Sequence, residues 1–440
     1  MIGAVWVPTN VRLTPPEVAY LAQDSGAAAY LFDPGFDAHA QAARDANPAA
    51  LLHIDLGPGW DQLTAHSPLA HPVDVDRDHP CWLFYTSGTT GRPKGGTLTH
   101  GQMAFVINNH RCDLMPGLTE ADVSLVVAPL SHGAGAHALP QVAAGAASVL
   151  LEGERLDPAE AWRLVARHRV SNMFTVPTIL TMLTRHDAVD QHDHSSLRHV
   201  IYAGAPMYRA DQVHALQKLG PVLVQYFGLG EVTGNITVLP PRLHSLADDP
   251  AFPIGSVGLP RTGMDIAILD PEGGRLGVGE TGEICVRGQA VFAGYWNNET
   301  ATATAFRNGW FHTGDLGHLN EQGFLWITGR GSDMFISGGS NVYPREIEEA
   351  LLLHPAIAEA CVVGMPHPRW GESGVAVIVL RPGVLATAPD LIAHLDHRLA
   401  RYKRPAEIVF WSELPKSGYG KVPKLEVRRR LDEAGLVLTE

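Results

Sequence analysis

The sequence predicts an α/β protein, with a large domain over residues 1–330 and a small domain over residues 331–440. In the first half, short apolar runs alternate with helical patterns, which is typical of parallel α/β layers. From about residue 255 to residue 295 the strands become shorter and are broken by Gly and Pro, which indicates a small antiparallel subdomain. Residues 331–440 combine helices and strands in the manner of a separate α+β domain.

The first predicted element is a helix that starts after Thr14, a favourable N-cap, with Pro15 at its first position. It ends near Asp24, before Gly26. Strands are expected over residues 28–32, 124–128, 148–151, 172–176, 199–203 and 222–225, and helices over residues 157–168 and 209–219. In the small domain we expect a helix from Pro344, strands over residues 361–363 and 375–380, and a helix over residues 390–400. The arginine run at residues 428–430 is interpreted as a solvated helix face.

Composition narrows the class of protein. Hydrophobic residues make up 45% of the chain, enough for a large core, and no apolar stretch reaches the roughly 18 to 20 residues of a membrane-spanning helix. The four cysteines are widely spaced and the start has no basic region of a signal peptide, which together suit the cytoplasm. A net charge of −13 argues against a nucleic-acid or anionic membrane surface. His192 and His194 flank Asp193, but no second cluster supports a metal site, so this segment is interpreted as a polar loop.

The most informative stretch is residues 85–95, which reads Tyr-Thr-Ser-Gly-Thr-Thr-Gly-Arg-Pro-Lys-Gly. Glycines let backbone N–H groups turn inward and hydroxyls add donors, so such a loop can wrap phosphate oxygens, with Lys94 as a mobile charge. It is not a Walker A loop, because Pro93 precedes the lysine and Gly95 follows it. A flexible surface turn is the alternative interpretation.

Together with later segments in the same order, this loop resembles the acyl-adenylate-forming (AMP-binding) superfamily of acyl-CoA synthetases, peptide-synthetase adenylation domains and firefly-type luciferases. Residues 226–231 (Tyr-Phe-Gly-Leu-Gly-Glu) resemble its aromatic-Gly-x-Thr-Glu motif, and residues 309–315 (Gly-Trp-Phe-His-Thr-Gly-Asp) resemble its Gly-Trp-x-x-Thr-Gly-Asp motif. Residues 329–348 resemble the domain junction, and residues 414–421 resemble the C-terminal segment with the catalytic lysine. The resemblance spans residues 85–421.

The resemblance implies that a carboxylic acid attacks the α-phosphorus of ATP, after which the small domain rotates about a hinge at Ser332 and CoA takes the acyl group. It assigns the phosphates to Thr86, Ser87, Gly88, Thr89, Thr90, Gly91 and Lys94. Glu231 would bind Mg²⁺, a hard ion that favours oxygen ligands. The threonine that normally precedes this glutamate is Gly230 here, so we expect a modest loss, offset by water or by Thr233.

The nucleotide pocket implied by the resemblance has Phe227 stacked on adenine, although simple core packing of Phe227 is the alternative. Asp315 would accept hydrogen bonds from the ribose hydroxyls, and Arg330 would contact the same ribose. The remaining pocket residues are Gly204, Ala205, Pro206, Tyr226 and Gly228. Lys421 would bridge the acyl carboxylate and the α-phosphate.

The acyl and CoA sites are also implied by the resemblance. His132 would gate the acyl pocket and touch the carboxylate, with a structural histidine as the alternative. Tyr226 stands where many relatives carry a small residue, so it would narrow the pocket or offer a hydroxyl. No arginine that would favour a dicarboxylate is evident. Gly338 and Gly339 would line the pantetheine tunnel, and Trp370 would either stack on the CoA adenine or pack on its own domain.

The predicted function is an AMP-forming acid–CoA ligase for a fatty or aryl acid, with ATP, Mg²⁺ and CoA. Residues 3–8 resemble a strand that relatives reach only after several strand-helix units, so we expect the front of the large domain to be missing and a sheet edge to be uncovered. That expectation, Gly230 and Ser332 favour the alternative of a non-catalytic nucleotide-binding remnant, whereas retention of the catalytic positions argues against it. An adenylating enzyme with a different acyl acceptor is a further alternative.

Overall fold

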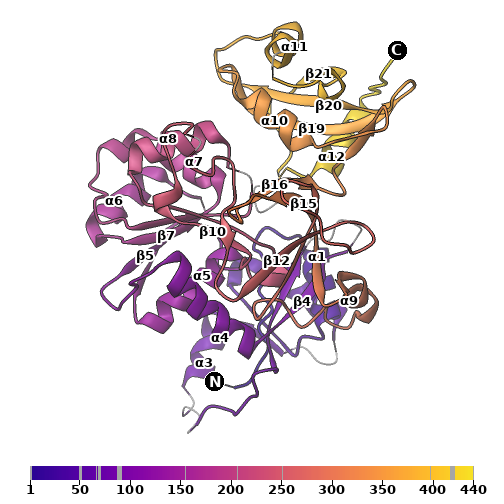
Figure 1. The fold of residues 1–440 in the computed structure, drawn as a ribbon. Coiled ribbons are helices and arrows are strands. Elements are labelled where there is room, and N and C mark those ends of the chain that lie inside the picture. The colour runs from indigo at the N-terminus through magenta and orange to yellow at the C-terminus, as the bar shows by residue number, and fades with distance from the viewer. Residues whose placement is uncertain are drawn as a thin grey trace.

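The computed structural model describes residues 2–48, 52–65, 67, 71–86, 92–153, 155–205, 207–249, 251–396, 398–416 and 422–439. Figure 1 shows a large body that runs from the N-terminus through the magenta and brown elements, with a smaller orange and yellow unit above it. Parallel α/β layers, an antiparallel sheet and a C-terminal α+β unit are all present, so the predicted fold class is confirmed. Within the described residues, no helix is both long enough and apolar enough to cross a membrane.

The N-terminal part is a small layer beside the rest. Helix α1 (Pro15–Ser25) follows Thr14, whose backbone N–H donates to Glu17 Oε2 at 2.7 Å, and it ends at Gly26 in the left-handed region. The other elements are β1 (Ala29–Phe32) and β2 (Leu52–Asp55), which pair in parallel, and α2 (Asp37–Ala46) and α3 (Pro58–Thr64). This sheet has two strands, and Leu52 is 59% exposed. The strand predicted near residues 3–8 is reduced to one bridge between Trp6 and Trp82.

The central sheet has the strand order β11-β10-β9-β8-β7-β5-β6. Its parallel strands are β5 (Val123–Val126), β6 (Ala147–Leu150), β7 (Asn172–Thr175), β8 (His199–Tyr202) and β9 (Leu223–Phe227). They lie within two residues of the predicted bounds. The antiparallel strands β10 (Thr237–Leu239) and β11 (Leu259–Pro260) extend the sheet beyond β9.

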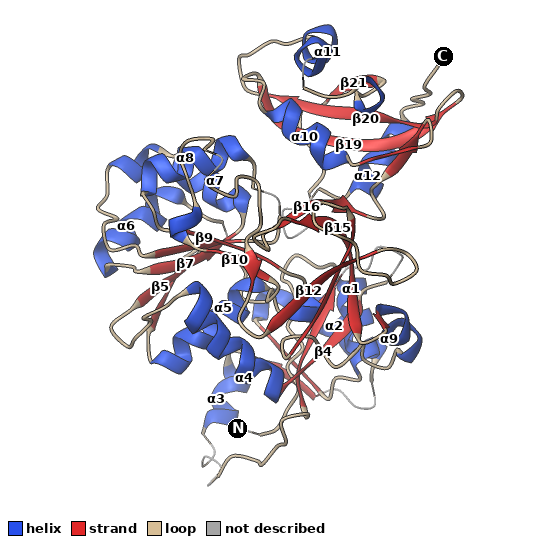
Figure 2. Cartoon of the chain, in the orientation of Figure 1, coloured by secondary structure: helices blue, strands red, loops and turns tan. Residues whose placement is uncertain are grey.

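Helices cover both faces of this sheet (Figures 1 and 2). One face carries α6 (Pro158–His168), α7 (Pro177–Arg185) and α8 (Arg209–Leu219), and the other carries α4 (His100–Asn109) and α5 (Gly133–Ala144). The fully buried Trp162 packs under the first face and donates its indole N–H to Leu183 O at 2.9 Å. Because the strands are parallel, the loops after β8 and β9 leave the sheet at the same edge, where ligands bind in open α/β sheets.

The antiparallel region extends further than predicted, to Arg330 instead of residue 295. It contains β12 (Met264–Leu269), β13 (Gly282–Gly288), β14 (Phe306–Arg307), β15 (Trp310–Leu319) and β16 (Leu325–Arg330), with α9 (Glu299–Ala305). The stretch read as a Gly-Trp-x-x-Thr-Gly-Asp motif is itself part of strand β15, which explains the difference. This sheet shares a core with the hairpin β3 (Pro80–Thr86) and β4 (Lys94–Thr99).

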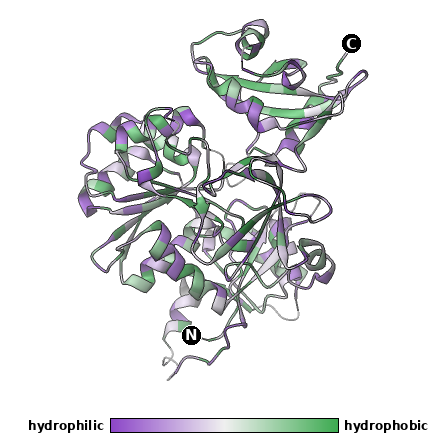
Figure 3. Ribbon diagram, in the orientation of Figure 1, coloured by the Kyte–Doolittle hydropathy of each residue, from purple (hydrophilic) through white to green (hydrophobic). Residues whose placement is uncertain are grey.

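The C-terminal unit is built on a long hairpin of β19 (Ile357–His367) and β20 (Gly371–Leu380). The shorter strands are β17 (Phe335–Ser337), β18 (Ser340–Val342) and β21 (Glu407–Phe410), and the helices are α10 (Pro344–Leu352), α11 (Ala388–Asp396) and α12 (Lys424–Glu433). Figure 3 shows β19 and β20 as largely hydrophobic, and their two faces pack into separate cores. On α12, Arg429 and Arg430 pair with Glu426 on the exposed face, as predicted.

Single turns complete the chain. They are the 3₁₀ turns η1 (Pro34–Phe36), η3 (Asp187–Asp190), η4 (Gly230–Val232), η5 (Pro241–Leu243) and η6 (Arg401–Lys403), and the π-helical turn η2 (His110–Leu114) that continues α4.

Candidate active site

Glu231 is the centre of the candidate site. It lies on η4, directly after β9, and is 6% exposed. Its Oε1 accepts hydrogen bonds from Thr86 Oγ1 at 3.0 Å and from Tyr295 OH at 3.1 Å. Both donors are neutral hydroxyls, so neither of these hydrogen-bond partners brings a positive charge to the carboxylate. The arrangement therefore suits a cation with a preference for oxygen ligands.

Tyr295 joins three parts of the fold at this point. Its hydroxyl donates to Glu231, and Lys94 Nζ lies 5.3 Å from the centre of its ring. The segment around it is fixed to β4, because Trp296 N donates to Gly95 O at 2.7 Å. Burial, followed by the nearby Glu231 charge, raises the pKa of Tyr295, so its hydroxyl keeps the proton that it donates. The sequence analysis gave this tyrosine no role.

Gly230 departs from the expected threonine for a steric reason. A Cβ at this position would lie 2.6 Å from Phe84 Cδ1 and 2.8 Å from Thr86 Cγ2. The Phe84 ring, which is 6% exposed, therefore occupies the volume that a side chain at residue 230 would need. Thr233 has its own partner, since its Oγ1 accepts from Gln102 Nε2 at 3.3 Å. The threonine hydroxyl is thus absent where Phe84 and Thr86 fill the volume that a side chain at residue 230 would need.

The predicted adenine pocket lies at the edge where β8 and β9 end. Phe227 is the last residue of β9 and is half-buried, and Gly204 follows β8 with a φ of +84° that favours glycine. At Gly228 the chain passes so close to Gly234 that a Cβ would lie 2.3 Å from its carbonyl carbon. The structure thus places Gly204, Ala205, Phe227 and Gly228 on two adjacent loops.

Asp315 and Arg330 lie opposite each other on β15 and β16. Arg330 Nε donates to Asp315 Oδ1 at 3.1 Å, and Asp315 is 5% exposed. The two residues predicted to contact one ribose are therefore in contact with each other. Next along the chain, Gly331 N donates to Gly314 O at 3.0 Å, and Ser332 Oγ lies 3.4 Å from Asp333 Oδ1.

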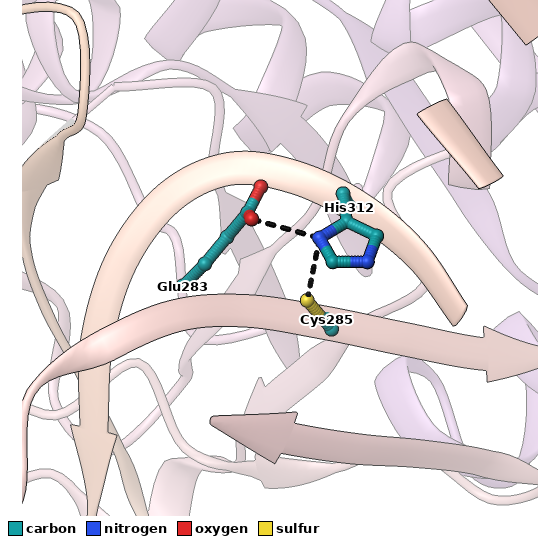
Figure 4. A group of neighbouring side chains, drawn as sticks. All are labelled: Glu283, Cys285 and His312. Atoms are coloured by element: carbon teal, nitrogen blue, oxygen red, sulfur yellow. Dashed lines mark hydrogen bonds and ion pairs between the residues drawn. The ribbon is translucent and has the colours of Figure 1, made fainter. Parts of the chain in front are cut away.

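Figure 4 shows a cluster of Glu283, Cys285 and His312, which is hydrogen-bonded through Glu283 to Gly314 in the turn that carries Asp315. Glu283 Oε2 is 2.7 Å from His312 Nδ1, and Cys285 Sγ is 3.2 Å from the same nitrogen. The spacing of these three side chains would allow a metal ion. However, Arg307 Nη2 already lies 2.6 Å from that nitrogen and 3.1 Å from Glu283 Oε2, so the arginine side chain supplies the positive charge there. Burial also raises the pKa of the Cys285 thiol to about 12, which disfavours the thiolate that a metal requires.

We interpret this cluster as a support for the turn. Glu283 Oε1 accepts from Gly314 N at 3.1 Å, and Thr313 Oγ1 donates to Ile284 O at 2.7 Å. Both bonds fix the backbone next to Asp315 to strand β13. The contacts of His194, in the predicted polar loop, are likewise structural. Its Nδ1 lies 3.1 Å from His192 O and its Nε2 lies 3.1 Å from Lys218 O.

His132, which was predicted to gate the acyl pocket, immediately precedes helix α5. Its ring centre lies 4.7 Å from that of Phe84, and the backbone after it is covered by Phe174, because a Cβ on Gly133 would lie 2.7 Å from Phe174 Cζ. Phe174 stacks on Tyr226 with centres 6.0 Å apart. Tyr226, which was predicted to narrow the acyl pocket or to offer it a hydroxyl, therefore packs against the ring that covers Gly133.

An arginine that the sequence analysis did not single out lies beside Tyr226. Arg261 Cζ lies 6.0 Å from the Tyr226 ring centre, and the arginine side chain is fully buried. It was missed because a Pro-Arg-Thr-Gly sequence is typical of an exposed turn. Its burial depends on contacts with residues far away in the sequence.

The predicted CoA residues come together on the small domain. Gly338 and Gly339 form the turn between β17 and β18 with positive φ angles of 57° and 82°. Gly338 N donates to Trp370 O at 3.0 Å, and a Cβ on Gly338 would lie 3.0 Å from Trp370 Cε3. Trp370 packs on this turn and remains 44% exposed, with Arg369 over its ring at 4.7 Å.

Several predicted site residues lie outside the described residues, namely Ser87, Gly88, Thr89, Thr90, Gly91, Pro206 and Lys421.

Comparison with known proteins shows which family the chain matches. The family profile described as AMP-binding enzyme matches residues 1–296, and the AMP-binding enzyme C-terminal domain profile matches residues 346–421. A feruloyl-CoA synthase from an Amycolatopsis species is 38% identical over 97% of this chain and 84% of its own length. Indoleacetate–CoA ligase from Aromatoleum aromaticum is 36% identical with the same coverage of 97% and 84%. The ATP-bound structure of MatB from Rhodopseudomonas palustris matches with a TM-score of 0.88 at 30% identity, over 98% of this chain and 84% of that one.

Proposed function

This chain belongs to the AMP-binding enzyme family and is an AMP-forming acid–CoA ligase, and we propose that the residues grouped around Glu231 perform its adenylation step. The observation that supports this assignment is the buried Glu231 carboxylate, held between Thr86 at the start of the predicted phosphate loop and Tyr295. Three separate segments of the chain meet there. Tyr295 contacts Glu231 through its hydroxyl and lies 5.3 Å from Lys94 Nζ at its ring centre.

In the first step, an oxygen of the acid attacks the α-phosphorus of ATP, and the bond from that phosphorus to the leaving pyrophosphate breaks. The reactants are all anionic, so positive charge must be concentrated where they meet. Lys94 would hold the leaving phosphates, and Lys421 would bridge the acid and the α-phosphate. Glu231 would hold Mg²⁺, which supplies positive charge to the phosphate oxygens when it is bound.

The nucleotide would be oriented by residues of both sheets. Phe227 would stack on adenine against Gly204 and Ala205, and the Asp315 carboxylate would accept the ribose hydroxyls. Arg330 would exchange part of its contact with Asp315 for the ribose. We also propose that His132 touches the acyl carboxylate, since it begins α5 beside Phe84.

In the second step, the CoA thiol sulfur attacks the acyl carbonyl carbon, loses its proton and expels AMP. Rotation of the domain over residues 331–440 about Ser332 would bring the Gly338–Gly339 turn to the site, and Trp370 would contact the CoA adenine. Its 44% exposure beside Arg369 leaves a face for this contact. We place the enzyme in the cytoplasm.

The acid is proposed to be an aryl or fatty acid. Relatives named for feruloyl-CoA and indoleacetate support the aryl class, and a relative named medium/long-chain-fatty-acid–CoA ligase, at 33% identity, supports the fatty class. The glycine at residue 230 does not favour a non-catalytic remnant, because Phe84 accounts for it.

ATP–pyrophosphate exchange across short, medium and long fatty acids and aryl acids tests this function. We expect exchange that depends on the acid, continues without CoA and is lost in Lys421→Ala. Folded protein that binds ATP but gives no exchange with any acid would contradict the assignment of the site.

A further inference from the structure

We propose that Arg261 forms a subsite at the far end of the acyl pocket, which recognises a neutral oxygen acceptor carried by the acid. This inference rests on the proposed function and names the substrate class of the same site. Such an acceptor is a hydroxyl, ether or carbonyl oxygen distant from the reacting carboxylate.

Arg261 is a buried cation with few partners. Its Nη1 is 3.5 Å from Gly234 O and its Nη2 is 3.2 Å from His110 Nδ1, whereas its Nε has no hydrogen-bond partner among the described residues. The pKa of Arg261 is lowered to about 10 by burial, so the group stays charged at neutral pH. A guanidinium has five N–H donors, and leaving any of these donors without an acceptor in the interior is unfavourable. A ligand oxygen would satisfy one of them.

A second, independent polar group, on the segment that pairs with the Arg261 backbone, also lacks a partner among the described residues. The Asn235 side chain is fully buried, and neither its Oδ1 nor its Nδ2 has a partner among the described residues. Asn235 is the neighbour of Ile236, whose carbonyl accepts from Arg261 N at 2.9 Å. Buried amides are normally satisfied, so the two unpartnered groups on these paired segments are available to a polar ligand.

Aromatic contacts connect this place to the reacting end of the pocket. His132 adjoins Phe84, and Phe174 covers the next residue, Gly133. Phe174 stacks on Tyr226, and the Tyr226 ring lies 6.0 Å from Arg261 Cζ. These contacts form a row that links the histidine proposed to touch the carboxylate with the buried arginine. An acid that lies along this row would place its far end beside Arg261.

The local charge decides which acceptor fits. Asp113 Oδ2 lies 3.8 Å from Arg261 Nε, and the same carboxylate accepts from Thr262 N and Thr262 Oγ1 at 2.8 Å each. The pair of Arg261 and Asp113 is therefore already neutral overall. A second carboxylate would add an uncompensated buried charge, whereas a neutral oxygen would accept a hydrogen bond without that penalty.

The test is ATP–pyrophosphate exchange by the full chain with a matched series, namely cinnamate and its 3- and 4-hydroxy, methoxy and carboxy derivatives, together with hexanoate and 6-hydroxyhexanoate. We expect at least one hydroxy or methoxy acid to exceed its unsubstituted partner in kcat/KM by about tenfold or more. In Arg261→Met that ratio falls towards one, because the oxygenated acid loses rate while the unsubstituted acid does not. In Asp113→Asn, which leaves Arg261 without its counter-charge, the 4-carboxy acid gains relative to the 4-hydroxy acid.

Arg209→Met is the matched control, because Arg209 is another largely buried arginine with a carboxylate partner, Asp248, outside the site. It should leave every ratio unchanged. Equal loss on all acids in Arg261→Met, or an unchanged preference, would mean that Arg261 is only structural and would overturn the proposal. If Arg261→Met does not fold, an Asp113→Asn protein with unchanged selectivity would overturn it as well. A wild-type chain that exchanges with no acid overturns the proposed function, a result distinct from these.

Discussion

At the scale of single residues, the site shows how one side chain can determine another. Phe84 occupies the volume beside Gly230, and Thr86, two residues after Phe84, supplies a hydroxyl to Glu231. The size of the residue at position 230 is therefore limited by packing against Phe84 and Thr86 rather than by the reaction. The same aromatic ring adjoins His132, the residue proposed to touch the acyl carboxylate.

Restoring a threonine at residue 230 should therefore be harmful. We expect Gly230→Thr to lower the free energy of unfolding by about 1 to 3 kcal/mol, because the new Cβ overlaps Phe84 and Thr86. Urea denaturation measures this change. Adding Phe84→Leu should recover most of the loss, and a double variant no more stable than the single one would contradict the steric explanation.

Tyr295 offers a test of the Glu231 site without a change in size. Tyr295→Phe removes the hydroxyl that donates to Glu231 Oε1, and we expect kcat/KM for ATP in the exchange reaction to fall by about tenfold. The thermal midpoint should change little, since the ring contacts remain. Tyr85→Phe is a control, because the Tyr85 hydroxyl donates to Asp24 instead. An equal effect of both variants would count against a specific role of Tyr295.

At the scale of elements, strands β13 and β15 hold the turn that carries Asp315. Glu283→Ala removes the acceptor of Gly314 N and the partner of Arg307, so we expect the KM for ATP to rise by about tenfold, with a smaller change in kcat. Arg287→Ala on the same strand breaks an exposed pair with Asp265 and should have no such effect. Steady-state exchange at varied ATP concentration distinguishes the two. A change in kcat alone would indicate another role for Glu283.

Elements with local signals could be predicted from the sequence. Thr14, Pro15 and Gly26 determine α1 through capping and backbone preference alone, and the parallel strands follow from short apolar runs. The extent of the antiparallel sheet could not be predicted in this way, because the residues of β15 form a recognisable motif and their pairing with β13 is long-range. Arg261 was missed for the same reason, since its partner His110 lies 151 residues away.

At the scale of the whole molecule, the two reaction steps would use different parts of the chain. Trp370→Ala should raise the KM for CoA by about tenfold in acyl-CoA formation and leave ATP–pyrophosphate exchange unchanged, because Trp370 belongs to the small domain. Trp411→Ala, a change of the same size in another part of that domain, serves as the comparison. Impaired exchange in Trp370→Ala would show that the residue acts before CoA binds.

Buried histidines make the whole fold sensitive to acid. Burial lowers the pKa of His137 to about 4 and that of His244 to about 4, while the unfolded chain titrates near 6.5. Below about pH 6.5 the unfolded state binds protons that the folded state does not, so stability falls with pH until about pH 4. Between pH 7 and pH 5 each histidine should lower the free energy of unfolding by about 2 kcal/mol.

Urea denaturation at pH 7 and pH 5 measures this loss, and His137→Gln should reduce it. The amide introduced by this substitution can still reach Asn172, the partner of His137 at 3.1 Å, so the hydrogen bond need not be lost. An identical pH dependence in the variant and in the wild type would show that His137 does not titrate as its burial indicates.

The contact between Phe84 and Gly230 also restricts the order in which mutations can be acquired. A chain with a larger residue at position 230 would have to hold two side chains in one volume as soon as phenylalanine arose at position 84. A chain without glycine at position 230 would therefore lose stability on acquiring Phe84, and a chain with Phe84 would lose stability on losing this glycine. Libraries that aim to broaden the accepted acids should vary both positions together, because screening either position alone would discard the productive pairs.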